Sequence, residues 1–207
     1  MQEHFYEDMR GITAQALAAV RPEAAVRKAL AEHSFAPGRI RLVAVGKAAW
    51  QMAEAAVGVL GRRIEKGIVI TKYGHSAGPL PGLLCREAAH PVPDQAGFAA
   101  TREALELVSG LGAEDTVLFL LSGGASALFE QPLVKPEELR SVTGALLACG
   151  CDIAQINTIR KRLSGVKGGR FALRCAPAQV FTVALSDVVG DAVDMIASGP
   201  TCPDSST

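Results

Sequence analysis

The chain has 207 residues, of which 49% are hydrophobic and 20% charged, and its 21 lysines and arginines balance its 21 aspartates and glutamates. A neutral chain does not favour non-specific binding to nucleic acid or to an acidic membrane. A chain this long and apolar buries about 70% of its unfolded surface, which excludes a disordered polymer or a small disulfide-stapled scaffold.

The N-terminal segment, residues 5–34, predicts two helices. Apolar residues recur there at helical spacing, namely Leu17, Val20, Ala24, Val26 and Leu30. Pro22 suits the first turn of the second helix. We expect this pair of helices to be a lid or a packing element.

Short β-rich runs then alternate with helical stretches. Strands are expected at residues 41–45, 67–71, 116–121 and 180–185, with 83–88 as a weaker fifth, and helices at 47–60, 95–110, 137–149 and 152–163. The strands are apolar without alternation, which indicates burial on both faces, as in a parallel sheet. We therefore predict one α/β domain over residues 1–207, a doubly wound, mostly parallel, Rossmann-like sheet with helices on both faces. Its ligands should bind at the carboxyl ends of the strands.

The five cysteines are odd in number, and no two have the C-x-x-C spacing. This pattern supports neither a disulfide framework nor a zinc site. The sequence also lacks a signal peptide pattern and any run of about 18 apolar residues. We therefore expect a cytoplasmic protein without membrane contact.

Two loops at strand ends carry candidate anion-binding groups. In loop 46–49, Lys47 stands where a helix dipole disfavours a cation, a conflict that a bound anion would resolve. The alternative is a solvated lysine whose stem packs on the sheet. In loop 122–126, paired glycines allow backbone N–H groups to approach an oxyanion. The alternatives there are an ordinary tight turn and a nucleophile elbow, which Leu128 weakens because that motif ends in glycine.

Charge is segregated near the C-terminal end. Residues 153–186 contain no acid and six basic residues, Arg160, Lys161, Arg162, Lys167, Arg170 and Arg174, whereas residues 187–207 contain no lysine or arginine and four acids, Asp187, Asp191, Asp194 and Asp204. Basic groups beside glycines can hold phosphate, and carboxylates on a loop can hold magnesium. Phosphoryl transfer uses this combination. The alternative is a basic helix and an acidic loop that balance one another.

Other motifs decide less. The turn 196–201 has hydroxyls that could donate to a ligand, or it is an ordinary turn. His75 and His90 fit a structural role better than a catalytic one, and no third ligand is spaced to form a metal site with them. The sequence lacks both a P-loop and G-x-G-x-x-G, which counts against P-loop enzymes and nicotinamide-dependent dehydrogenases.

Seven motifs in order resemble the glycerate 2-kinase family that carries a C-terminal MOFRL domain. They are GKAA (46–49), KYGH (72–75), HPVPD (90–94), LSGGASAL (121–128), NTIRKRLSGVKGG (157–169), SDVVGD (186–191) and SGPT (198–201). The resemblance implies transfer of phosphate from ATP, with Mg²⁺, to the 2-hydroxyl of D-glycerate, giving 2-phosphoglycerate. Family members are also labelled hydroxypyruvate reductase, so an NAD(P)H-dependent reductase is one alternative.

The resemblance also implies that this chain is the N-terminal lobe of a two-lobe kinase. Family members are about twice as long, and the C-terminal MOFRL domain is absent from this sequence. We therefore expect little activity from the chain alone and a need for the missing lobe or for a homo-oligomer. A third alternative is a non-catalytic binding or assembly module.

The resemblance further implies roles for individual residues. Lys47 would be the catalytic or charge-stabilising lysine. The substrate and phosphate would face Ser122, Gly123, Gly124, Ser126, Asn157, Arg160, Lys161 and Lys167. The nucleotide would lie against Gly168, Gly169, Ser198 and Gly199. Magnesium would be held by Asp187 and Asp191.

Overall fold

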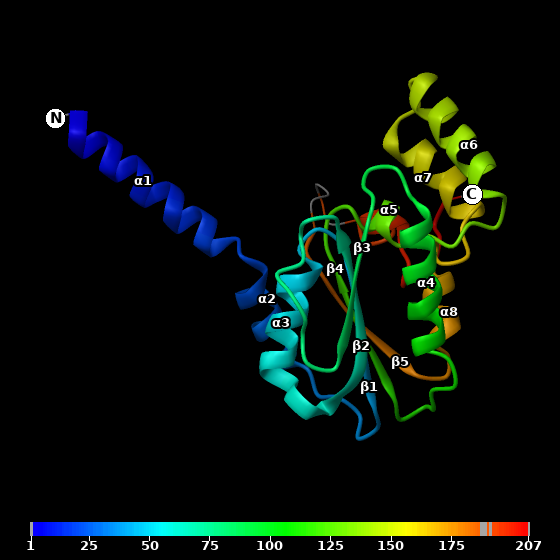
Figure 1. Cartoon of the computed structure of the whole chain (residues 1–207), viewed down its shortest axis with the longest axis horizontal. Helices are drawn as coiled ribbons and strands as arrows, with labels where there is room; N and C mark the ends of the chain where they lie inside the picture. Colours follow the sequence, from blue (N-terminus) through cyan, green and yellow to red (C-terminus); the bar gives the residue numbers. More distant parts are fainter. Residues whose placement is uncertain (1, 187–189, 191, 207) are drawn as a thin grey trace.

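The computed structural model describes residues 2–186, 190 and 192–206. Within them lies a five-stranded sheet in the order β3-β2-β1-β4-β5, in which every pair of neighbours is parallel (Figure 1). The strands are β1 (Ile40–Val45), β2 (Ile64–Lys72), β3 (Leu83–Ala88), β4 (Thr116–Leu121) and β5 (Gln179–Ala184). The predicted doubly wound α/β fold is confirmed, and the strand order reverses between β1 and β4, which is where such sheets bind ligands.

Alternate residues of the central strand enter two separate cores. Val43 and Val45 of β1 join a core with α4 (Gln95–Leu107) and α8 (Arg170–Cys175), whereas Leu42 and Ala44 join a core with α2 (Pro22–Glu32) and α3 (Ala49–Leu60). Successive side chains of a strand point to opposite faces. The sheet is therefore covered by helices on both faces, as its uninterrupted apolar strands predict.

Three more helices lie at the carboxyl ends of the strands. The short helix α5 (Ala125–Leu128) directly follows β4, and α6 (Pro136–Ala148) packs beside α7 (Ile153–Arg162) above the sheet (Figure 1). Asp152 caps α7 because its carboxylate accepts from the N–H of Gln155 at 2.8 Å. The cap fixes where α7 begins, and thereby the positions of the polar residues farther along it.

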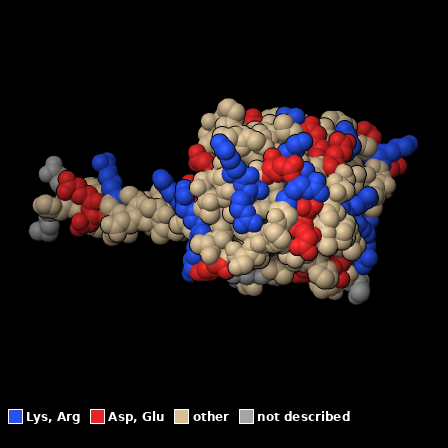
Figure 2. All heavy atoms as spheres, turned by 90° about the horizontal axis from the view of Figure 1, so that it is seen from below, with Lys and Arg blue, Asp and Glu red and all other residues tan. Residues whose placement is uncertain are grey.

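The two N-terminal helices behave differently. In α2, Val26 and Leu30 are buried against the body, as a packing element requires. In contrast, α1 (Gln2–Ala19) leaves the body, and its side chains from His4 onward are exposed (Figures 1 and 2). The expected packing role is therefore wrong for α1, because Leu17 is 61% exposed and no side chain from His4 to Ala19 is buried. None of the helices in the described part of the chain is long and apolar enough to cross a membrane.

Candidate functional site

A pocket of about 440 Å³ opens at the carboxyl end of the sheet, beside the exit of β4. Its walls come from the loop after β4, from α7 and from a turn that follows β5. The lining residues are His90, Ser122, Gly123, Gly124, Ala125, Ser126, Asn157, Arg160, Met195, Ile196 and Ala197. Two of the predicted segments, loop 122–126 and α7, thus meet at one place.

The loops that follow β1 and β4 are joined by hydrogen bonds at the pocket. The N–H of Lys47 donates to the carbonyl of Gly123 at 2.9 Å, and the N–H of Ala48 donates to Ser122 Oγ at 3.1 Å. Gly46 has φ +124°, and a Cβ there would collide with Ser122 Oγ. Only glycine suits such a backbone and such a close approach, so the two loops hold each other in a fixed arrangement.

Lys47 lies in the turn before α3, not in the first turn of the helix as predicted. Its side chain is exposed and passes Gly124, where a Cβ would lie 3.2 Å from Lys47 Cε. Gly124 has φ +89°, a left-handed conformation that favours glycine. The bare glycine leaves room for the lysine stem at the edge of the pocket.

His90 also lies beside Gly124 and lines the pocket, a position that sequence reasoning missed. Burial lowers the pKa of His90, and the positive charges of Lys47 and Lys72 lower it further. The ring is therefore neutral at pH 7. The only signal in the sequence was its place in the HPVPD motif.

Three segments are joined by hydrogen bonds between polar side chains. Ser126 Oγ lies 2.9 Å from Ser198 Oγ, and Ser198 donates to Asn157 Oδ1 at 3.1 Å. Arg160 Nη2 donates to the carbonyl of Ser126 at 3.0 Å. The structure thus brings together four of the predicted site residues, drawn from three separate motifs.

The turn that carries Ser198 has an unusual backbone. Ala197 and Ser198 have φ values of +52° and +62°, and Gly199 follows with +62°. Non-glycine residues in this region cost on the order of 1 kcal/mol each. The strained turn faces the pocket, since Ala197 lines it and Ser198 is fully buried behind it.

Arg160 offers the clearest unpaired donor in the pocket. Its Nε is buried and has no hydrogen-bond partner. Burial lowers the pKa of the guanidinium, and the negative charge of Glu130 acts in the opposite direction. Among the described residues, the N–H groups of Gly123 and Gly124 donate to no acceptor either. A carboxylate or a phosphate would fit this donor set.

Lys161 was also predicted to face the substrate or phosphate, and in the structure it does not line this pocket. Only 1% exposed, it forms ion pairs with Asp204 at 3.1 Å and with Asp194 at 3.6 Å. Arg162 also approaches Asp204, at 3.8 Å. Lys161 and Arg162 of the basic segment thus pair with Asp194 and Asp204 of the acidic segment, as the alternative interpretation of the charge pattern predicts. Hydrogen bonding from Ser206 and the charge of Lys161 lower the pKa of Asp204 to about 2.

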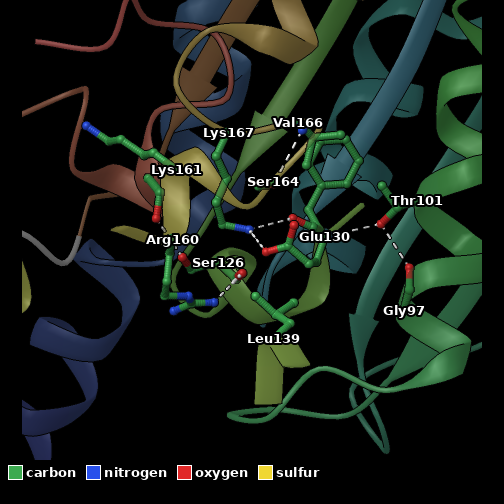
Figure 3. Close-up of polar contacts among 12 residues, drawn as sticks. Gly97, Thr101, Ser126, Glu130, Leu139, Arg160, Lys161, Ser164, Val166 and Lys167 are labelled. Carbon is green, nitrogen blue, oxygen red and sulfur yellow. Dashed lines mark hydrogen bonds and ion pairs between the residues drawn. The ribbon is translucent and has the colours of Figure 1, made fainter. Parts of the chain in front are cut away.

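Lys167 was predicted to face the substrate or phosphate, and in the structure it is fully buried and does not line the pocket. Its ammonium donates to Glu130 Oε2 at 2.6 Å and to the carbonyl of Phe129 at 3.1 Å (Figure 3). Sequence reasoning missed Glu130, because a single acid outside any motif gives no sign of the lysine that it meets.

Gly168 and Gly169 stand behind the strained turn and do not line the pocket. Their N–H groups donate to the carbonyls of Ser198 and Gly199 at 3.0 and 2.7 Å. Both have positive φ, and a Cβ on Gly169 would lie 2.9 Å from the carbonyl oxygen of Cys202. The four residues predicted to bind the nucleotide are thus in mutual contact, with the glycine pair supporting the turn.

The predicted magnesium ligands, Asp187 and Asp191, lie outside the described residues. The described part of the chain contains no group of three or more histidines, cysteines or acids that could hold a metal ion. The nearby carboxylates of Asp194 and Asp204 already pair with Lys161. The assignment of magnesium to Asp187 and Asp191 therefore stays a prediction.

A pocket at the switch point of a parallel sheet, walled by glycines and a half-buried arginine, defines an α/β domain with a site suited to a small anionic ligand. A family model described as "Domain of unknown function (DUF4147)" matches residues 8–207. The chain belongs to this family.

Several relatives are named as kinases. The D-glycerate 2-kinase of Thermotoga maritima is 56% identical over 198 residues, which are 95% of this chain and 47% of the relative. The glycerate 2-kinase of Pyrococcus horikoshii is 41% identical over 172 residues, or 82% of this chain and 38% of the relative. A crystal structure of glycerate kinase from Thermotoga maritima superposes with a TM-score of 0.92 at 53% identity, covering 99% of this chain and 50% of that one. The chain thus spans about half the length of the curated relatives it matches.

Proposed function

We propose that the chain forms the ligand-binding N-terminal lobe of a D-glycerate 2-kinase, which transfers phosphate from ATP to the 2-hydroxyl of D-glycerate. The observation that carries the proposal is the donor set of the pocket, where the unpaired Nε of Arg160 lies near the glycine pair 123–124. The similarity to the Thermotoga and Pyrococcus kinases supports the choice of reaction.

The residues of this chain would act mainly by positioning and by neutralising charge. In-line phosphoryl transfer spreads negative charge over the oxygens of the transferred group, and donors held in place stabilise it. Arg160 and the N–H groups of Gly123 and Gly124 would bind an anionic group of a reactant. Lys47 stands exposed at the edge of the pocket and would add positive charge on the side open to solvent.

The donor set of the pocket fits the phosphates of ATP, which supplies the phosphoryl group when bound. Magnesium, when bound, would neutralise the charge on those phosphates. Asp187 and Asp191 remain its proposed ligands, and the roles of Arg160 and Lys47 do not depend on a metal. We also propose a cytoplasmic location, and we propose that turnover needs a second lobe such as the additional length of the relatives provides.

The reaction is tested in a chain that carries this lobe together with the second half of the Thermotoga kinase. Enolase converts 2-phosphoglycerate, but not 3-phosphoglycerate, into phosphoenolpyruvate, so the ultraviolet absorbance of phosphoenolpyruvate formed with ATP, Mg²⁺ and D-glycerate reports the proposed product. We expect Lys47→Met to lower kcat at least ~100-fold, in line with the loss of one charge-stabilising donor. The matched control is Lys66→Met, an exposed lysine far along β2 from the pocket.

Two other outcomes would contradict the proposal. Oxidation of NADH with hydroxypyruvate, without phosphoenolpyruvate formation, would identify a reductase. If calorimetry on the 207-residue chain shows no heat with ATP or with D-glycerate, and the fused chain is also inactive, a binding or assembly module would be the remaining function.

A further inference from the structure

Beneath the pocket, two cations lie near one buried carboxylate. Glu130 and Lys167 are both fully buried, and Lys167 Nζ lies 2.6 Å from Glu130 Oε2. Arg160 comes from α7, lines the pocket and donates to Ser126 near this pair (Figure 3). Burial lowers the pKa of Arg160 and that of Lys167, and the negative charge of Glu130 opposes this effect at both cations. The cluster thus has one more positive charge than negative charge.

Glu130 is held in place by its backbone. Its N–H donates to Thr101 Oγ1 at 3.1 Å, and that hydroxyl donates to the carbonyl of Gly97 at 2.8 Å, which ties the residue to α4. The backbone of Glu130 therefore stays with α4, and its carboxylate reaches only as far as the side chain allows. Whichever cation pairs with Glu130 must therefore come to it.

Lys167 takes that position, and Arg160 does not. None of the carboxylates in the described ranges forms an ion pair with Arg160. Its guanidinium donates to the carbonyl of Ser126 at 3.0 Å, while Nε stays without a partner. If Arg160 were paired with a buried carboxylate, its guanidinium N–H groups would donate to that carboxylate and would not be available to a ligand.

We propose that Lys167 is a positioning residue that neutralises Glu130 and thereby leaves Arg160 free to bind an anionic group in the pocket. The inference rests on the proposed function, because it concerns the same pocket. It gives a functional role to Lys167 and Glu130, neither of which contacts a ligand. Without Lys167, an unpaired carboxylate would remain in the interior, where attraction between opposite charges is strong. Arg160 would turn toward it and away from the pocket.

The test compares single and double variants of the 207-residue chain by calorimetric titration with inorganic phosphate and with ATP. We expect Lys167→Met to weaken binding about tenfold or more, as loss of one charge-assisted contact would. Adding Glu130→Gln should restore the affinity, because it removes the charge that attracts Arg160. Lys167→Arg should keep the affinity of the parent.

Lys161→Met is the matched control, because Lys161 is a second buried lysine of the same segment and pairs with Asp204 instead. If it loosens the segment and weakens binding, Glu130→Gln should not restore that loss. Rescue confined to Lys167→Met supports the positioning role. Equal loss in the single variant Lys167→Met and in the double variant overturns it and leaves the proposed function standing.

Two further results decide the remaining cases. If the parent chain binds neither phosphate nor ATP, the anion site of this lobe fails and this inference fails with it, whereas the proposed function is then decided by the activity of the fused chain. If Lys167→Met does not fold, the single variant Glu130→Gln is measured instead. The inference requires Glu130→Gln to bind phosphate as tightly as the parent chain. A tenfold loss of affinity, about 1.4 kcal/mol, would overturn the inference.

Discussion

The ε-carbon of Lys47 lies 3.2 Å from the point where Gly124 would carry a Cβ, and the ring of His90 lies 3.0 Å from the same point. Gly124→Ala would therefore push both side chains away and place alanine at φ +89°. We expect a loss of stability of about 1 kcal/mol from the backbone, and weaker ATP binding in calorimetry.

The control for this substitution is Gly144→Ala in α6, where a Cβ would meet nothing within 4 Å. We expect it to raise the free energy of unfolding by roughly 0.5–1 kcal/mol, since glycine weakens a helix interior. Chemical denaturation measures both variants. A destabilising effect at Gly144 similar to that at Gly124 would contradict the role of the left-handed backbone at Gly124.

Ser198 combines two hydrogen bonds with a strained backbone. Ser198→Ala removes the contacts with Ser126 and Asn157 and keeps φ at +62°. We expect it to cost about 1–3 kcal/mol, because the buried Asn157 carbonyl oxygen loses its donor. Ser198→Gly loses the same bonds but relieves the backbone, so it should cost less. Equal losses in thermal unfolding would show that the strain has no energetic effect.

The lowered pKa of Asp204 predicts that the free energy of unfolding depends on pH in the acid range. The pKa of its carboxylate is lowered to about 2 from an ordinary value of 3.8, so the group binds a proton more readily in the unfolded chain. Its contribution is then fully present above about pH 4 and disappears as the pH falls toward 2. In urea titrations over this range, Asp204→Asn should flatten the fall in stability relative to the parent chain. An unchanged slope would contradict the ion pair with Lys161.

Because the side chains of α1 from His4 onward are exposed, we expect its removal to change the stability of the protein little. From His4 to Ala19 its side chains are exposed, so a chain that begins at Val20 should have the same free energy of unfolding within about 0.5 kcal/mol. Truncation into α2, past the buried Val26, should destabilise the fold strongly and serves as the comparison. Loss of cooperative unfolding on removal of α1 alone would show a contact with the body.

The sequence predicted the sheet well because parallel strands buried on both faces leave a simple apolar pattern. The weak run at residues 83–88 is β3 with the same bounds. The short helices α5 and α8 were not predicted, because four and six residues are too few to show a helical period. Lys47 falls outside α3 because Gly46 at φ +124° turns the chain before the helix begins.

The candidate site was predicted only in part. Loop 122–126 follows β4 at the edge of the sheet where such folds bind ligands, and α7 brings Asn157 and Arg160 to the same edge. The partners of Lys161 and Lys167 could not be predicted, because Asp204 and Glu130 are 43 and 37 positions away in the sequence. A charge pattern read along the chain shows how many charges are present but not which of them meet in the interior.

The strained turn at residues 197–199 follows β5 in the chain, yet it lines a pocket that is also lined by the loop after β4 and by His90. During synthesis from the N-terminus, the loop after β4 leaves the ribosome about 70 residues before this turn does, as the sequence order dictates. While only the loop after β4 has been synthesised, the pocket is incomplete, so a bound ligand cannot stabilise the growing chain. The sheet must form on its own apolar contacts, and any stabilisation by an anion bound in the pocket begins only when residues 197–199 have been added.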